Sequence, residues 1–152
     1  MGKLMVKRLD WMDDVARVKQ ARSLPITDPV REAELLRAME KRGVASGLPA
    51  VAVRPFFAGQ MTAARQYQKE WLTQHPGSNL HMKQSPLPDL VKTVRPALDE
   101  IGTEMIAALV KARRTDDEAA IISSALTQLT NAGYSATVIN PAIQGLKAGL
   151  DK

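Results

Sequence analysis

The 152-residue chain contains no cysteine, only two histidines, and aromatic residues make up just 4% of it. Without cysteine there can be no disulfide framework, no thiolate nucleophile and no cysteine-ligated zinc. Strand-forming residues are sparse as well, whereas leucine, alanine, methionine, lysine, arginine and glutamate are abundant. This composition favours helices over strands, so we predict an all-α fold.

The sequence also lacks an apolar run long enough to span a membrane and an N-terminal apolar segment of the kind found in signal peptides. We therefore expect no membrane partner. The protein is expected to be cytoplasmic if the chain is complete, or exported if a signal peptide has been removed. Its length suits a single domain, residues 1–152, and its net charge of +5 permits an anionic ligand without identifying one.

Hydrophobic periodicity and capping signals predict a bundle of about six helices. Asp28 is expected to cap the second helix, with Pro29 at its first position. Residues 75–88, which include both histidines, are predicted to form a loop. The predicted helices cover about residues 4–23, 29–45, 49–73 with an interruption or kink at Pro55, 88–113 with a bend near Pro96, a fifth helix opening at 115–118, and 136–150.

Two cations lie on the apolar face of the first predicted helix. Arg8 and Lys19 are eleven residues apart, and at about 100° per residue they return to one face, which also carries Met5, Met12 and Val15. Burying unpaired cations is unfavourable. This pattern therefore predicts that the two side chains bind an anion.

Other predicted helices carry polar residues in similar positions. Gln68 interrupts the apolar stripe of the third helix, Arg31 and Glu32 lie in the first turn of the second, and Arg95 borders the apolar face of the fourth. Each has a simpler structural explanation, because a lone cation often extends along the core edge to a carboxylate and a lone glutamine is often a satisfied buried amide. Four cations against one carboxylate favour instead a pocket inside the bundle for a small polyanion.

These residues and their spacing resemble the all-α chorismate mutases, and more closely the exported, or gamma, subclass. The resemblance covers about residues 4–113, the catalytic helices, and residues 115–152 resemble the additional C-terminal helices of that subclass. It rests on the run Arg8-Leu9, Lys19, Leu24-Pro25-Ile26, Asp28 and Arg31-Glu32, followed by Val53-Arg54-Pro55-Phe56-Phe57, Gln60 and Gln68.

The resemblance implies an isomerase that converts chorismate to prephenate for phenylalanine and tyrosine biosynthesis, without a cofactor or metal. It also implies a periplasmic or secreted homodimer. Ala64 and Leu35 depart from the polar residues that relatives often carry at these positions. The implied roles are substrate carboxylate binding by Arg8, Arg95 and Arg31, donation to the ether oxygen by Lys19 and Gln68, and binding at the ring hydroxyl by Glu32 and Asp28.

Two other functions remain open at this point. A catalytically inactive relative could bind chorismate-like metabolites as a sensor. A basic helical module could bind nucleic acid or another protein, but it would need an outward-facing cationic stripe. The cations here point inward, so we expect no nucleic-acid partner.

Overall fold

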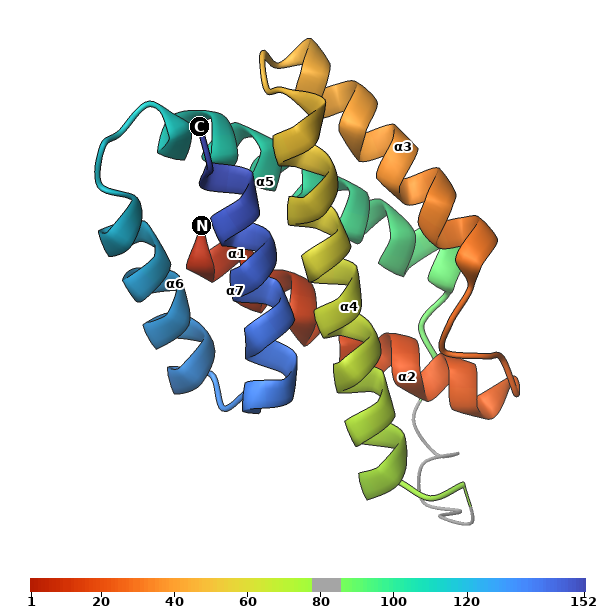
Figure 1. Ribbon diagram of the computed structural model, residues 1–152. Coiled ribbons are helices and arrows are strands. Elements are labelled where there is room, and N and C mark those ends of the chain that lie inside the picture. The colour runs from red at the N-terminus through yellow and green to blue at the C-terminus, as the bar shows by residue number, and fades with distance from the viewer. Residues whose placement is uncertain (78–85) are drawn as a thin grey trace.

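A computed structural model describes residues 1–77 and 86–152. All regular structure in these two ranges is helical, which confirms the predicted fold class. No helix among them is both long enough and apolar enough to cross a membrane. The elements are α1 (Gly2–Asp10), α2 (Met12–Ala21), α3 (Pro29–Ala45), α4 (Ala50–Gln74), the π-helical turn η2 (Leu90–Val94), α5 (Arg95–Arg113), α6 (Glu118–Asn131) and α7 (Ala136–Leu150) (Figure 1).

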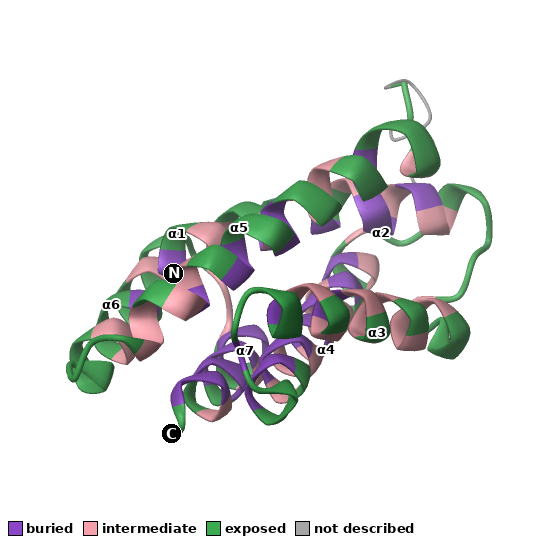
Figure 2. Ribbon diagram, turned by 90° about the horizontal axis from the view of Figure 1, so that it is seen from above, coloured by how far each residue is buried: buried purple, intermediate pink, exposed green. Residues whose placement is uncertain are grey.

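The helices form two layers around a common core. Figure 2 shows α1, α2, α5 and α6 on one side and α3, α4 and α7 on the other, with the buried residues turned toward the space between them. The long helix α4 is central, because it contacts α1, α2, α3 and α7. This arrangement brings residues from both halves of the chain together along α4.

The predicted helix starts are confirmed where a local signal marked them. The Asp28 side chain accepts a 3.1 Å hydrogen bond from the Arg31 backbone N–H, and Pro29 opens α3. Asp117 caps α6 in the same way, through the backbone N–H of Ala120. A side-chain oxygen at this position satisfies one of the unpaired N–H groups of the first turn, so these boundaries are determined locally.

The first predicted helix is wrong in detail. In the structure this helical segment begins at Gly2, ends at Ala21, and is divided into α1 and α2 at Trp11. The division is slight, because Trp11 keeps right-handed helical dihedral angles (φ −71°, ψ −15°) and its carbonyl accepts from the Val15 N–H at 3.1 Å. The helical direction therefore continues, and Arg8 and Lys19 still face the same pocket.

Of the interruption or kink predicted at Pro55, the interruption is wrong, because α4 runs through this residue. Proline removes the hydrogen bond that its N–H would have made to the carbonyl four residues earlier, that of Val51. Val51 is 81% exposed, so water can reach this region of the backbone. The missing bond is thus tolerated near the start of a long helix.

The predicted loop over 75–88 is described only at its ends, and His81 lies outside the described residues. The following helix ends at Arg113 as predicted, but its first turn is the π-helical η2, capped by the Asp89 side chain. Pro96 stands at the second position of α5, where it has no N–H to donate to the carbonyls of the η2 turn that precedes it. The change from π-helix to α-helix therefore lies at the position where a bend was predicted, near Pro96.

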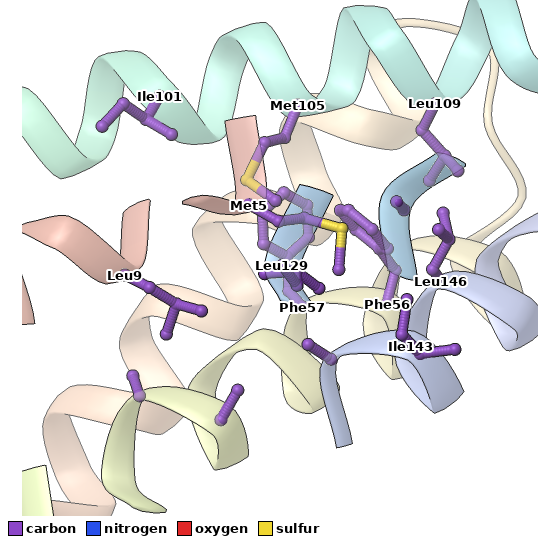
Figure 3. Close-up of a cluster of buried hydrophobic side chains, with 14 of the residues drawn as sticks. Met5, Leu9, Phe56, Phe57, Ile101, Met105, Leu109, Leu129, Ile143 and Leu146 are labelled. Atoms are coloured by element: carbon purple, nitrogen blue, oxygen red, sulfur yellow. The ribbon is translucent and has the colours of Figure 1, made fainter. Parts of the chain in front are cut away.

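Residues from α6 and α7 complete the main core. Figure 3 shows Met5 and Leu9 of α1 packed with side chains of α4, α5, α6 and α7. Leu129 and Leu146 are fully buried in this cluster. The C-terminal helices are thus part of the same hydrophobic core as the N-terminal ones.

Two glycines allow α4 and α7 to pack closely. A Cβ atom at Gly145 would lie 2.8 Å from the Phe56 carbonyl oxygen and 3.0 Å from the Gly59 Cα, while one at Gly59 would lie 2.6 Å from the Pro141 carbonyl oxygen. These neighbours are backbone atoms, which cannot rotate away as a side chain can. Any larger residue at either position must push the helices apart.

Gly145→Val is therefore expected to lower the free energy of unfolding by about 1–3 kcal/mol, the usual range for overpacking a core. Chemical denaturation monitored by circular dichroism measures this change. The matched control is Lys147→Val on the exposed side of the same helix, for which a change within about 0.5 kcal/mol is expected. Equal effects of the two substitutions would show that the close helix contact does not limit stability.

Candidate active site

A pocket of about 230 Å³ lies between the two helical layers. Its wall is mostly apolar, with charged groups at several points, as is usual for sites that bind small molecules. Five of the seven predicted site residues line it: Arg8, Lys19, Asp28, Arg31 and Arg95. They come from α1, α2, the loop before α3, α3 itself and α5, so only the tertiary fold brings them together.

Arg8 contributes a cation with no acidic partner among the described residues. Its guanidinium donates a 3.0 Å hydrogen bond to the backbone carbonyl of Gln60, and this is its one hydrogen bond there. Burial lowers the pKa of Arg8 to about 10. A guanidinium has five N–H donors, so most of them remain available to an anion in the pocket.

Lys19 lies three helical turns further along and is also partly buried. Its Nζ donates a 2.8 Å hydrogen bond to the Ile26 carbonyl, which positions the ammonium group. Burial lowers the pKa of Lys19; the nearby carboxylates of Glu32 and Asp28 oppose this shift, and the charge of Arg95 adds to it. These influences indicate that the four groups lie close enough to act on one another.

The remaining two cations lie nearer the solvent. Arg31 makes a loose pair with Glu34 at 3.7 Å, and its side chain is 37% exposed. Arg95 is exposed at the first position of α5 and has no ion pair among the described residues. An exposed pair of this kind is weak, so both side chains are free to exchange solvent contacts for a ligand.

Glu32 and Gln68, the other two predicted residues, do not line the pocket. The Glu32 carboxylate instead forms a 2.8 Å ion pair with Arg65. Gln68 is buried, and its amide nitrogen donates to the Met12 sulfur at 3.6 Å. Its side-chain oxygen has no hydrogen-bond partner in the described part of the chain.

The pairing of Gln68 is weak, because a thioether sulfur is a poor hydrogen-bond acceptor. A buried amide with one weak partner and one missing partner is unfavourable in a fold, and such groups need an explanation. Met12 lies on the same helical stripe as Arg8 and Lys19. Gln68 is thus close to the wall of the pocket without facing it.

Sequence reasoning missed three charged residues that bear on the site. Arg65 binds Glu32 and also donates to the Thr62 hydroxyl at 3.0 Å. Asp99 lines the pocket one turn after Arg95, and its carboxylate is held by Arg42 at 2.8 Å. The spacing of four residues could have placed Asp99 near Arg95, but nothing in the sequence showed where Arg42 and Arg65 find their partners.

Comparisons with known proteins show which family the chain resembles. The family model described as chorismate mutase type II matches residues 1–69. The secreted chorismate mutase of Yersinia pestis is 28% identical over 117 residues, which are 74% of this chain and 59% of that protein. The chain thus spans less than two thirds of the length of this relative.

Two solved structures share the fold over nearly their whole length. The crystal structure of chorismate mutase from Burkholderia thailandensis has a TM-score of 0.80 at 30% identity, covering 97% of this chain and 95% of that one. For chorismate mutase from Burkholderia phymatum the TM-score is 0.78 at 22% identity, with coverage of 99% and 94%. Because similarity in sequence and in fold extends over the whole of one such chain, the protein belongs to the chorismate mutase family.

Proposed function

We propose that this chain converts chorismate to prephenate. Chorismate is a dianion, and its rearrangement breaks a C–O bond while a C–C bond forms within one molecule. This reaction requires no nucleophile, metal or cofactor. The observation that carries the proposal is the pocket between the helical layers, into which four separate segments bring Arg8, Lys19, Arg31 and Arg95.

The cations suit the first requirement of this reaction, which is to hold the substrate side chain over the ring. Arg8 and Arg95 are proposed to bind the two carboxylates, and Arg31 to complete the set of donors. Guanidinium groups bind carboxylates through paired hydrogen bonds that set orientation as well as affinity. Fixing the reacting carbon atoms close together supplies part of the rate enhancement by removing conformational freedom in advance.

The second requirement is to stabilise negative charge on the ether oxygen as the C–O bond breaks. Lys19 is proposed to donate to this oxygen, because its ammonium is held in the pocket and is partly shielded from water. Gln68 is proposed as the second donor. Among the described residues, the acceptor of its amide N–H is the Met12 sulfur, so a substrate oxygen would be a stronger partner.

Glu32 and Asp28 are proposed to bind at the ring hydroxyl. Both carboxylates influence the pKa of Lys19, which supports their nearness to the reacting end of the pocket. The 2.8 Å ion pair with Arg65 restricts the orientation of the Glu32 carboxylate. Asp28 also caps α3, so the orientation of its side chain is already set.

Loss of chorismate followed by ultraviolet absorbance, with purified protein, tests the proposal directly. The expected result is turnover that depends on Lys19 and Arg8. Binding of chorismate without turnover would identify a metabolite sensor instead. Absence of both binding and turnover would refute both functions for this pocket.

Turnover is expected to stay nearly constant from mildly acidic to mildly basic pH, if Gln68 is a donor. An amide does not titrate, whereas a glutamate at this position would have to carry a proton to donate. The pH profile of kcat measures this, and Gln68→Glu serves as the matched variant, whose activity should fall as pH rises from acidic to neutral. A steep fall in the unmodified protein over the same range would contradict the assignment.

We further infer that the protein is exported and forms a homodimer, as in the gamma subclass. The secreted relative from Yersinia pestis supports export. Detection of the mature protein in the periplasmic fraction or the medium, and a solution mass of two chains, test these two points. The core shared by α1 and α6–α7 supports a single domain over residues 1–152, which a single cooperative unfolding transition would check.

A further inference from the structure

The pocket contains two carboxylates as well as its four cations, and each carboxylate is already engaged. Asp28 accepts the backbone N–H of Arg31 at the start of α3. Asp99, one turn into α5, is bound by Arg42. Of the two, only Asp99 has a cationic partner from outside the pocket, so its charge is partly neutralised without using a pocket cation.

Asp99 and Arg95 are four residues apart on the same helix, and both line the pocket. Residues at this spacing are neighbours on a helix surface and readily form ion pairs. Asp99 does not take this local partner. It pairs at 2.8 Å with Arg42 of α3. Other residues of α3 line the pocket, but Arg42 does not.

Arg42 is well placed to hold Asp99 in this way. Its second terminal nitrogen donates to the hydroxyl of Thr103 at 3.3 Å, one turn after Asp99 on α5. The guanidinium thus contacts two successive turns of α5 at once. The side chains of Arg42 and Asp99 are 40% and 50% exposed, so the pair lies at the rim, where its effect depends on ionic strength.

We propose that Arg42 is a positioning residue: by binding Asp99 it keeps this carboxylate away from Arg95, and so leaves Arg95 to bind a substrate carboxylate. The inference rests on the proposed function. Without Arg42, Asp99 would pair with Arg95 or stand unneutralised in the path of a dianion. Both outcomes weaken substrate binding, and neither touches the reacting bond.

Steady-state kinetics with chorismate at low ionic strength test this inference in three variants. Arg42→Met is expected to raise KM about 3- to 10-fold with kcat changed less than about 2-fold, because only binding is affected. Asp99→Asn should leave KM at or below the unmodified value. The double variant Arg42→Met with Asp99→Asn should return to the level of Asp99→Asn, and added salt should reduce the defect of Arg42→Met.

The double variant separates this role from a structural one. If Arg42 mattered only as a bridge between α3 and α5, removing Asp99 would not restore binding, and that result would overturn the inference. An unchanged KM in Arg42→Met would overturn it as well. Arg54→Met is the matched control, since Arg54 of α4 pairs with Glu40 of α3 at 3.2 Å outside the pocket, and its kinetics should be unchanged.

Two further measurements keep the outcome clear. Thermal unfolding is recorded for every variant, and Arg42→Gln, which also removes the charge, replaces Arg42→Met if the latter does not fold; its KM should rise in the same way and an unchanged KM would overturn the inference. Turnover by the unmodified protein tests the proposed function separately. If chorismate binds without turnover, calorimetry measures Kd for the same variants. If the double variant Arg42→Met with Asp99→Asn then binds chorismate no better than Arg42→Met, the inference is overturned equally.

Discussion

Replacement of Lys19 by alanine is expected to lower kcat by about 10²–10³-fold, the usual loss when one donor to a developing negative charge is removed. The ammonium group is held in the pocket by the Ile26 carbonyl, and its surroundings are partly dry. In such surroundings a fixed charge stabilises the transition state more than water would. The helical content should be unchanged, because alanine favours a helix at least as well as lysine does.

Steady-state kinetics and circular dichroism together measure this effect. Lys69→Ala, an exposed lysine of α4, is the matched control and should keep full activity. Near-normal turnover in Lys19→Ala would remove this residue from the mechanism. A large loss of helical signal would mean that the kinetic effect is indirect.

The proton on Lys19 is also expected to set an alkaline limit to activity. Because burial lowers its pKa in the free protein, the fall of kcat/KM at high pH should begin below the ordinary lysine value of 10.5. A bound dianion favours the charged form and raises this pKa, so the corresponding fall in kcat should occur at higher pH. Identical alkaline limits for kcat and kcat/KM would argue against a titrating lysine next to the substrate.

Arg8→Met is the second substitution with a large expected effect. Removal of one member of a close charge pair costs about 2–5 kcal/mol of binding, so kcat/KM should fall by about 10²–10³-fold. Methionine keeps much of the length of the apolar stem but removes the cation. The loss should appear for the anionic substrate without any loss of folding.

Stability is expected to stay the same or to increase in this variant. Burial lowers the pKa of Arg8 to about 10 in the fold, so the charged form is less favourable in the folded chain than in the unfolded one. This penalty is present below about pH 10 and is relieved as the pH rises above this value. Removing the charge removes the penalty at neutral pH.

Thermal unfolding at neutral pH, measured beside the kinetics, checks this combination of lost activity and retained stability. Arg114→Met, at the exposed end of α5, is the control and should change neither property. A clear drop in stability for Arg8→Met would show that Arg8 mainly supports the fold, through its bond to the Gln60 carbonyl. Retained activity would show that it does not bind the substrate.

The sequence predicted the helices well where the signal is local. Asp28 with Pro29, and Asp117 in the run 115–118, stand at helix starts, because a capping side chain acts on the backbone within three residues of itself. The interruption predicted at Pro55 failed for the opposite reason. Whether a helix continues through proline depends on what surrounds the unpaired carbonyl, and spacing does not show this.

For the site, too, the predictions that rest on local periodicity succeeded, and those that depend on tertiary packing did not. Helical periodicity was enough to place Arg8 and Lys19 on one face, and the positions of Arg31 and Arg95 on their predicted helices added the other two cations; all four line the pocket. Periodicity also placed Gln68 on an inward face. It could not show that Gln68 lies behind the pocket wall, against the sulfur of Met12.

By itself, then, the sequence determined the helical class, most helix boundaries and the inward direction of four cations. These depend on backbone geometry and on residues at most a few turns apart. The tertiary structure alone decided which charges are neutralised: Glu32 by Arg65 and Asp99 by Arg42, while Arg8 keeps no acidic partner among the described residues. Ion pairing falls steeply with distance in water, so the contacts between helices far apart in the sequence set the electrostatics of the pocket.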